Sequence, residues 1–335
     1  MHNFKISSGK FGPYETIIMS NLKTNESVEF TLYGCTIIRF NHSVNGELFN
    51  VLDGFESPEE LTAAKGARCW IMTPYANRIP DGKYSFDGKN YQLKSIPPRT
   101  QVMHGFTSYK TFKVNYSNAD DNKAEVHLST EIRKDKFEGY PFDVRVNIYF
   151  TLEDNKLSIK VEGENIGNSP APFWSGWHPY FKTSDNGIEH LIVTINADEI
   201  VLMDNALIPI KGEGAYSNLK NHPEKDFREN LPEHKRIVNG RKFDVCYAAL
   251  QRDENGYSYT SIYDKVKDFG ITLFQKGGYV LMFSGDSLTR GKRQSLAMEP
   301  MQFLTDSYNR KEFEEDIKIN PGEKKSFEFG VLLKP

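Results

Sequence analysis

Apolar and polar side chains alternate along much of this chain with a period of two. Over residues 144–152 every second position is apolar, and the alternation returns over 157–161 after a polar turn at 153–156. Such alternation gives a strand one buried face, so the two segments predict a β-hairpin. The same pattern around a short turn predicts three further hairpins, at residues 16–33, 84–93 and 270–284.

Helix signals are few. The clearest is Ser57-Pro58-Glu59-Glu60, where serine suits the N-cap, proline the first helical position and Glu60 the third. We expect a short helix there that Gly66 can end. Residues 205–240 are polar and interrupted by proline and glycine, which indicates a loop-rich segment. Strands over the whole length predict an all-β fold of antiparallel sheets packed face to face, in a single domain over residues 1–335.

The composition narrows the possible partners. The 335 residues include 42 Lys and Arg and 45 Asp and Glu, which gives a formal net charge of −3. This near-balance argues against nucleic acid or an anionic membrane surface as a partner. No run of about 18 apolar residues occurs, so no membrane span is predicted. Aromatic residues make up 13% of the chain, and such side chains favour strands and line sugar sites.

The cysteines and histidines give no sign of a disulfide framework or a metal site. Cys35, Cys69 and Cys246 are odd in number and far apart, and the histidines show no metal-ligand spacing. The N-terminus has no signal-peptide pattern, so a cytoplasmic location is expected. No glycine-rich nucleotide motif is present either, so we expect the protein to work without a cofactor.

Four short clusters combine ionisable side chains with rigid aromatic, proline or glycine neighbours. Each residue also has a purely structural interpretation. Arg78 could close a salt bridge, His104 could be a satisfied buried histidine, and Glu299 could be a paired carboxylate at a strand end. His178 could be a turn residue before proline. The clusters are PYANRIPDG at 74–82, MHGF at 103–106, WSGWHPYF at 174–181 and MEPMQ at 298–302.

Taken together and in this order, the clusters resemble the aldose 1-epimerase (galactose mutarotase) family, in a divergent bacterial-type branch. The resemblance extends from about Gly34 to a turn at residues 320–323. It implies a large antiparallel β-sandwich with few short helices and a sugar bound in a cleft on one sheet face. It also implies that His178 is the general acid and Glu299 the general base. The residues implied to hold sugar hydroxyls are Asn77, Arg78, His104, Asp244 and Gln302.

The chain departs from the family pattern beside three of these motifs. Trp177 precedes His178 where many members have asparagine, and Phe106 follows His104-Gly105 where many have a second glycine. Pro-Met follows Glu299 in place of Thr-Gln. These changes leave the acid and the base in place, and they concern which sugar is bound.

Mutarotation needs the kind of groups that the motifs supply. Ring opening removes a proton from the anomeric hydroxyl and delivers one to the ring oxygen, which requires a base and an acid. A carboxylate is ionised at pH 7, and a histidine with a pKa of about 6.5 still has an accessible protonated form. The expected partner is therefore a free aldohexose or aldopentose, bound by a monomer or a homodimer.

Two other functions fit the same sequence. One is mutarotation of a hexose phosphate, which requires at least two cations aimed at the phosphate, with Arg68, Arg78 and Arg99 as candidates. The other is a carbohydrate-binding or regulatory protein that keeps the fold without turnover. The presence of both His178 and Glu299 argues against the second, because a binding protein needs neither at those positions.

Overall fold

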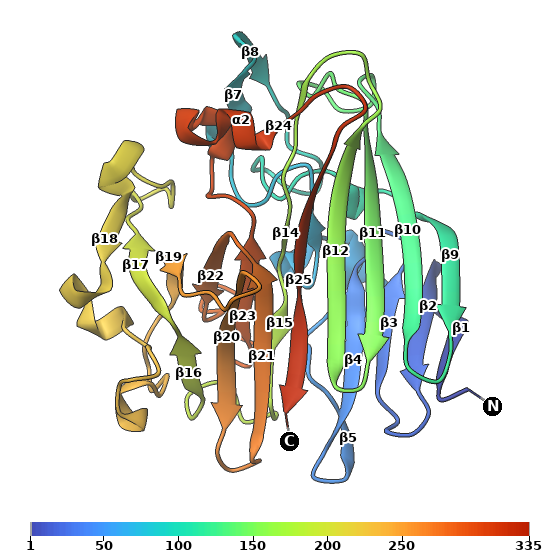
Figure 1. Cartoon of the computed structure of the whole chain (residues 1–335), viewed down its shortest axis with the longest axis vertical. Helices are drawn as coiled ribbons and strands as arrows, with labels where there is room; N and C mark the ends of the chain where they lie inside the picture. The colour runs from blue at the N-terminus through green and yellow to red at the C-terminus, as the bar shows by residue number, and fades with distance from the viewer. Residues whose placement is uncertain (1, 335) are drawn as a thin grey trace.

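The computed structural model describes residues 2–334, and antiparallel strands dominate it (Figure 1). A central sheet of eight strands has the order β16-β20-β21-β25-β12-β11-β10-β9. Its strands are β9 (Lys113–Ala119), β10 (Ala124–Ile132), β11 (Val144–Glu153), β12 (Lys156–Asn165), β16 (Ile192–Ile195), β20 (Tyr257–Asp264), β21 (Phe269–Lys276) and β25 (Lys324–Lys334).

Two further sheets accompany the central one. The N-terminal sheet has five strands in chain order: β1 (Phe4–Phe11), β2 (Tyr14–Asn21), β3 (Ser27–Thr31), β4 (Ile37–Val44) and β5 (Glu47–Asn50). The third sheet has the order β18-β17-β19-β22-β23-β14-β6, and β15 also pairs with β23. Its strands are β6 (Ile71–Met72), β14 (Gly176–Trp177), β15 (Tyr180–Phe181), β17 (Ala197–Val201), β18 (Tyr216–Asn218), β19 (Asp244–Leu250), β22 (Tyr279–Phe283) and β23 (Leu296–Met301).

Short elements complete the chain. Two-stranded pairs are formed by β7 (Lys83–Phe86) with β8 (Lys89–Gln92) and by β13 (Ala171–Pro172) with β24 (Lys318–Ile319). The α-helices are α1 (Pro58–Thr62) and α2 (Glu314–Ile317). The 3₁₀ turns are η1 (Lys65–Ala67), η2 (Pro80–Gly82), η3 (Thr107–Tyr109), η4 (Gly212–Ala215), η5 (Leu219–Asn221), η6 (Pro223–Lys225), η7 (Glu233–Lys235), η8 (Ser307–Asn309) and η9 (Lys311–Phe313).

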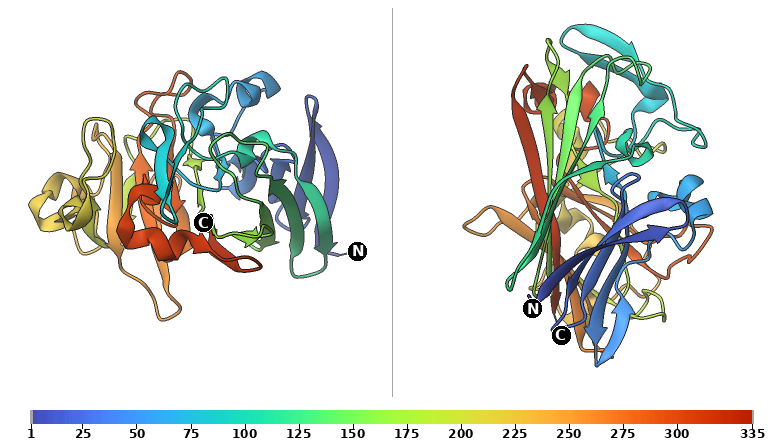
Figure 2. Two further views of the ribbon diagram at one scale, coloured as in Figure 1. Left: turned by 90° about the horizontal axis from the view of Figure 1, so that it is seen from above. Right: turned by 90° about the vertical axis from the view of Figure 1, so that its right-hand side faces the viewer.

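The N-terminal and third sheets both pack against one face of the central sheet. Phe150, Ile159 and Phe329 lie directly opposite one another on β11, β12 and β25, so their side chains share a face. Phe30 of the N-terminal sheet stacks on Phe150, and Trp177 of the third sheet stacks on Phe329, with centroid distances of 4.3 and 5.8 Å. Figure 2 shows the N-terminal strands in blue as a layer separate from the central strands. The all-β, antiparallel sandwich expected from the sequence is thus confirmed.

Three of the four predicted hairpins are present. Strands β2 and β3, β7 and β8, and β11 and β12 each pair antiparallel across their predicted turns. The N-terminal helix signal is also confirmed, because Oγ of Ser57 accepts a hydrogen bond from the N–H of Glu60. Residues 205–240 contain short turns and the strand β18, as the loop-rich interpretation expects.

The fourth predicted hairpin, at residues 270–284, is wrong. Both strands exist, but β21 pairs with β20 and β25, whereas β22 pairs with β19 and β23. Gly277 and Gly278 have φ of 83° and 73°, and they carry the chain from the central sheet to the third sheet. A glycine pair between two alternating segments is typical of both connections, so the pattern alone does not distinguish them.

The helix at residue 58 ends earlier than its sequence suggests. Its last residue is Thr62, and Ala64 already has the left-handed φ of 55°. Gly66 lies in the next turn, η1, rather than at the helix end. No helix in residues 2–334 is both long and apolar enough to cross a membrane.

Candidate active site

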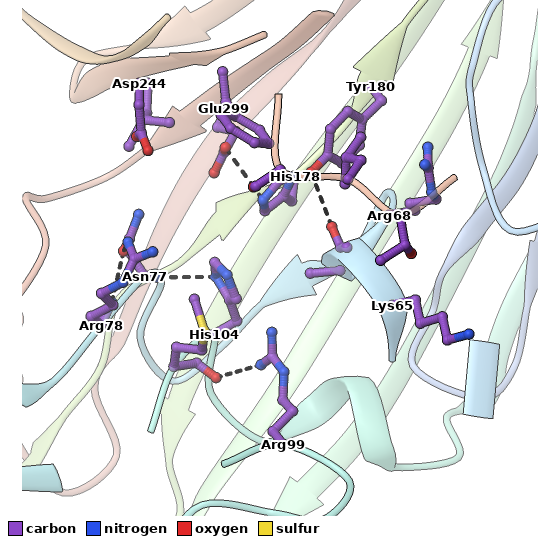
Figure 3. Close-up of a pocket in the computed structure, with 18 of the residues that line it drawn as sticks. Lys65, Arg68, Asn77, Arg78, Arg99, His104, His178, Tyr180, Asp244 and Glu299 are labelled. Atoms are coloured by element: carbon purple, nitrogen blue, oxygen red, sulfur yellow. Dashed lines mark hydrogen bonds and ion pairs between the residues drawn. The ribbon is translucent and has the colours of Figure 1, made fainter. Parts of the chain in front are cut away.

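A cavity of about 430 Å³ brings together side chains that are far apart in the sequence (Figure 3). It lies where the third sheet meets the loops around residues 65–68, 77–78 and 99–104. Six of the seven site residues expected from the sequence line it: Asn77, Arg78, His104, His178, Asp244 and Glu299.

His178 and Glu299 face each other because of strand register. β14 and β15 flank His178, and both pair with β23, through Gly176 with Met301 and Tyr180 with Ala297. When this register is continued through the residues between β14 and β15, His178 lies directly opposite Glu299. Their side chains meet in the cavity, with Nε2 of His178 at 3.3 Å from Oε1 of Glu299. The pairing of two strands therefore fixes the separation of these two groups.

The main chain of His178 is held from its other side. Its N–H donates to the carbonyl oxygen of Trp70, and its carbonyl oxygen accepts from the N–H of Cys69. The imidazole stacks on the ring of Tyr180 at 4.9 Å between centroids, and the Tyr180 hydroxyl donates to the carbonyl oxygen of Gly66. Backbone and ring contacts thus fix the position of the imidazole before any ligand arrives.

The loops that carry Asn77 and His104 are joined to each other. The N–H of His104 donates to the carbonyl oxygen of Asn77, and the N–H of Asn77 donates to Nδ1 of His104. Because Nδ1 accepts a hydrogen bond, a neutral His104 carries its proton on Nε2. Burial, and then the nearby Arg99, hold the pKa of His104 well below its ordinary value. His104 therefore presents a neutral N–H donor.

The glycine after His104 is required by this junction. Gly105 has a left-handed φ of 64°, and a Cβ atom there would lie 1.9 Å from the carbonyl oxygen of Thr73. Thr73 and Gly105 form a bridge between the two loops, and the N–H of Phe106 donates to the same carbonyl oxygen. The second glycine found in many family members is replaced by Phe106, whose side chain is buried. The contact with Thr73 uses only the main chain at this position, so it does not need a glycine there.

The electrostatics of the His178–Glu299 pair disfavour charge. Both residues are buried, with 7% and 2% of their surfaces exposed. Burial lowers the pKa of His178 to about 3. Burial raises the pKa of Glu299 well above its ordinary value, Asp244 raises it further, and Arg78 opposes the rise. The pair therefore keeps a single proton over a wide pH range, either as carboxylic acid and imidazole or as the tautomeric ion pair.

Arg78 and Asp244 lie at one end of the cavity. Nη1 of Arg78 donates to Oδ1 of Asn77 at 3.0 Å, which holds the guanidinium beside the amide. Burial raises the pKa of Asp244, and Arg78 opposes this rise. Oε2 of Glu299 is buried and has no hydrogen-bond partner within residues 2–334, so an acceptor is left free beside this end.

Gln302 is not brought to the cavity. The main-chain N–H of Ser175 donates to its Oε1, and its own N–H donates to the carbonyl oxygen of Ser175. Gln302 follows the end of β23 three positions after Glu299, an odd offset that directs side chains to opposite faces of a strand. Gln302, expected from the sequence to bind a hydroxyl, is thus absent from the cavity lining, and its side chain fastens β23 to the segment before β14.

Several residues of the cavity were not singled out from the sequence. They are Lys65, Tyr180, Leu281, Phe283 and Arg290, among others. Tyr180 follows the His178-Pro179 motif, which is a signal that could have found it. Nothing local marks Lys65 or Phe283. Within the residues that the structure describes, no group of three or more His, Cys, Asp and Glu side chains is arranged to hold a metal ion.

A model of the family described as aldose 1-epimerase matches residues 16–331 of the sequence. This chain belongs to the aldose 1-epimerase family. The match covers every residue of the cavity named above, and the order of motifs that suggested the resemblance is confirmed.

Individual members of the aldose 1-epimerase family are distant from this chain. The aldose 1-epimerase of Escherichia coli is 24% identical over 341 residues, which cover 94% of this chain and 93% of that protein. The uncharacterized protein YihR of E. coli is 24% identical over 254 residues, 75% of this chain and 74% of its own length. A galactose mutarotase-like protein from Clostridium acetobutylicum has a solved structure with a TM-score of 0.81 at 16% identity, with 99% of each chain covered. The fold of that structure is shared with this chain.

Proposed function

We propose that the protein is a mutarotase, an isomerase that interconverts the α and β anomers of an aldose by general acid–base catalysis. The observation that carries this proposal is the pair His178 and Glu299, opposed at 3.3 Å and buried in a cavity. Membership of the aldose 1-epimerase family supports it, as does the ring of hydrogen-bonding side chains around the pair.

Ring opening uses the two groups together. Glu299, as carboxylate, takes the proton from the anomeric hydroxyl while protonated His178 gives a proton to the ring oxygen. The C1–O5 bond breaks with its electron pair going to O5, and the former O–H pair completes the carbonyl at C1. Rotation about C1–C2 presents the other carbonyl face, and the reverse transfers close the ring. The pair begins and ends with one proton, so this scheme consumes no cofactor.

The other cavity residues have the task of holding the sugar. His104 offers its Nε2–H, Arg78 and Asn77 offer further donors, and Asp244 offers an acceptor. Leu281, Phe283 and Tyr180 supply apolar surface for the C–H face of the ring. Fixing the hemiacetal between acid and base is itself a large part of catalysis, because reactive groups then need no encounter.

The proposal is tested by the rate of exchange between the α and β anomeric protons, measured by saturation-transfer NMR. Glu299→Gln and His178→Asn are each expected to lower kcat by roughly 10²–10⁴-fold on the best of D-glucose, D-galactose, L-arabinose and glucose 6-phosphate. Glu328→Gln and His127→Asn are matched controls, because both residues lie outside the cavity on the central sheet. Saturable binding of a sugar without exchange above the buffer rate at any pH would instead establish a binding protein.

A further inference from the structure

The cavity is lined by five cationic side chains, and two of them are neutralised by carboxylates. Nη1 of Arg68 lies 2.5 Å from Oδ2 of Asp53. Arg290 contacts Asp53, Glu56 and Glu60 at 2.7 to 3.0 Å. Arg68 and Arg290 thus have their charges satisfied within the fold. Arg68, a candidate for phosphate binding from its sequence position, is corrected to a structural residue.

Arg99 is a cation without an anion. Within residues 2–334 it forms no ion pair, and its Nη1 donates to the neutral carbonyl oxygen of Met103 at 2.7 Å. Its guanidinium lies 4.6 Å from the centre of the Trp70 ring, and desolvation lowers its pKa. Figure 3 shows the guanidinium directed into the cavity beside His104. A partly buried cation that lacks a counter-ion is unfavourable, and an anionic ligand would relieve this arrangement.

Lys65 also lines the cavity and has no ion-pair partner in the described part of the chain. It belongs to the tight turn η1, where Ala64, Gly66 and Ala67 all have left-handed φ values of 50° to 73°. This turn brings an exposed ammonium group to the rim. Figure 3 shows Lys65 across the cavity from Asp244 and Arg78, while the Arg99 guanidinium lies between these two sides, beside His104.

We propose that Arg99 binds an oxyanion carried by the sugar, so that the preferred substrate is an aldose with a phosphate, sulfate or carboxylate group remote from C1. The planar guanidinium suits a bidentate contact with such a group, and Lys65 adds a point charge from the rim. The uncharged hydroxyls then face Arg78, Asn77 and Asp244. This inference rests on the mutarotase function proposed above, since it names the substrate class of the same cavity.

The test compares kcat/KM for anomer exchange of glucose 6-phosphate, glucose 6-sulfate and glucuronate with that of D-glucose. The wild-type protein is expected to favour at least one charged sugar by at least ~10-fold. Arg99→Gln, which keeps a donor for the Met103 carbonyl, is expected to lower the ratio of charged to neutral sugar by ~10–100-fold, and Lys65→Gln by ~3–10-fold. Lys89→Gln, an exposed lysine of β8, should leave the ratio unchanged. A wild-type ratio near one, or a ratio that Arg99→Gln leaves alone, overturns the proposal.

A binding arm separates failure of this inference from failure of the mutarotase proposal. Intrinsic tryptophan fluorescence, to which Trp70 under Arg99 contributes, is monitored in the Glu299→Gln variant during titration with glucose 6-phosphate or D-glucose. One possible result is that the phosphate sugar binds more tightly than D-glucose, that Arg99→Gln abolishes this difference, and that the wild-type protein exchanges the anomers of no sugar. This result supports the oxyanion site and refutes the mutarotase. Exchange on D-glucose without preference for any charged sugar supports the mutarotase and refutes the oxyanion site.

Discussion

The main-chain N–H of Asn77 donates a hydrogen bond to Nδ1 of His104 over 3.2 Å, and this contact sets the tautomer of the imidazole. The only ring proton of neutral His104 is then on Nε2, the donor that we propose for a sugar hydroxyl. His104, which the sequence predicts to bind substrate, is therefore oriented by the main chain of Asn77, a second predicted substrate-binding residue.

The first prediction concerns the charge of His104. Burial and Arg99 hold its pKa well below the ordinary value, so the ring should stay neutral at pH 5, where free imidazole is protonated. ¹⁵N NMR should show an Nε2–H tautomer from pH 5 to 8. His104→Gln, which keeps a donor, is expected to raise KM by ~3–10-fold, and His104→Leu by more. Titration of the His104 ring between pH 5 and 7 contradicts this account.

The second prediction concerns the pH profile of kcat/KM. Ordinary pKa values assign the acidic limb to Glu299 and the alkaline limb to His178, but burial reverses the order. Protonation of His178, with its pKa at about 3, should limit activity only in strong acid, and loss of the Glu299 proton should set the alkaline limb. We expect the acidic limb near pH 3 and the alkaline limb well above the ordinary pKa of a glutamate. An acidic limb at the ordinary pKa of a histidine would be incompatible with this order.

Two variants test which group sets the alkaline limb. Asp244 raises the pKa of Glu299, so Asp244→Asn should move that limb to lower pH. Arg78 lowers the same pKa, so Arg78→Ala should move it to higher pH. Both variants should also raise KM, since both residues line the cavity. Limbs that move in the same direction, or do not move, assign the titration to another group.

The third prediction compares two glycines with left-handed φ. Gly105→Ala combines an unfavourable φ with a clash against the Thr73 carbonyl oxygen, so a loss of at least ~2 kcal/mol in the free energy of unfolding is expected. Gly88→Ala, in the β7–β8 turn, has the same sign of φ but no atom within 4 Å of the added Cβ, and should lose only ~1 kcal/mol. Urea unfolding measures both. Equal losses would show that the close approach at Gly105 is unimportant.

The fourth prediction concerns the buried pair Asp53–Arg68. Burial alone would raise the pKa of Asp53, but Arg68, Ser295 and Arg290 outweigh it and lower that pKa. Asp53→Asn leaves Arg68 buried without its carboxylate, which is expected to cost ~3–5 kcal/mol of unfolding free energy. Asp185→Asn, which breaks an exposed pair with Lys182, should cost less than ~1 kcal/mol.

The pH dependence of that loss has a definite sign. Because the pKa of Asp53 is lower in the folded than in the unfolded protein, its contribution is complete above the unfolded value of about 3.9. It disappears as the pH falls through the folded value. The difference between wild type and Asp53→Asn should therefore be constant from pH 5 to 8 and shrink below about pH 4. A difference that grows in acid assigns the stability to another group.

The sequence predicted the local part of this structure well. Alternation over residues 144–161 is enough for the β11–β12 hairpin, because both strands and their turn are contiguous. The β21–β22 prediction failed because a glycine pair can reverse a chain within a sheet or pass it to another. The register that opposes His178 and Glu299 joins segments some 120 positions apart, and nothing local encodes it.

Among the arginines, sequence could name candidates but not distinguish them. Arg68 and Arg99 both stand near the motifs, yet Asp53 neutralises one and no described carboxylate neutralises the other. Such a difference depends on which acidic residues the fold brings close. The family motif placed Gln302 close to Glu299 in the sequence. The alternation of side chains along β23, however, directs the two side chains to opposite faces.

The shared register of β14, β15 and β23 divides the site into two parts that can change independently. Proton transfer depends on a spacing set by sheet geometry, which loop substitutions leave untouched. Lys65 and Arg99 belong to no strand of that sheet, so their side chains can be substituted without changing the register that opposes His178 and Glu299. A designer who wishes to redirect the proposed activity to a different sugar would thus substitute these two side chains, and would keep both the strands and the Gly66 carbonyl that holds Tyr180.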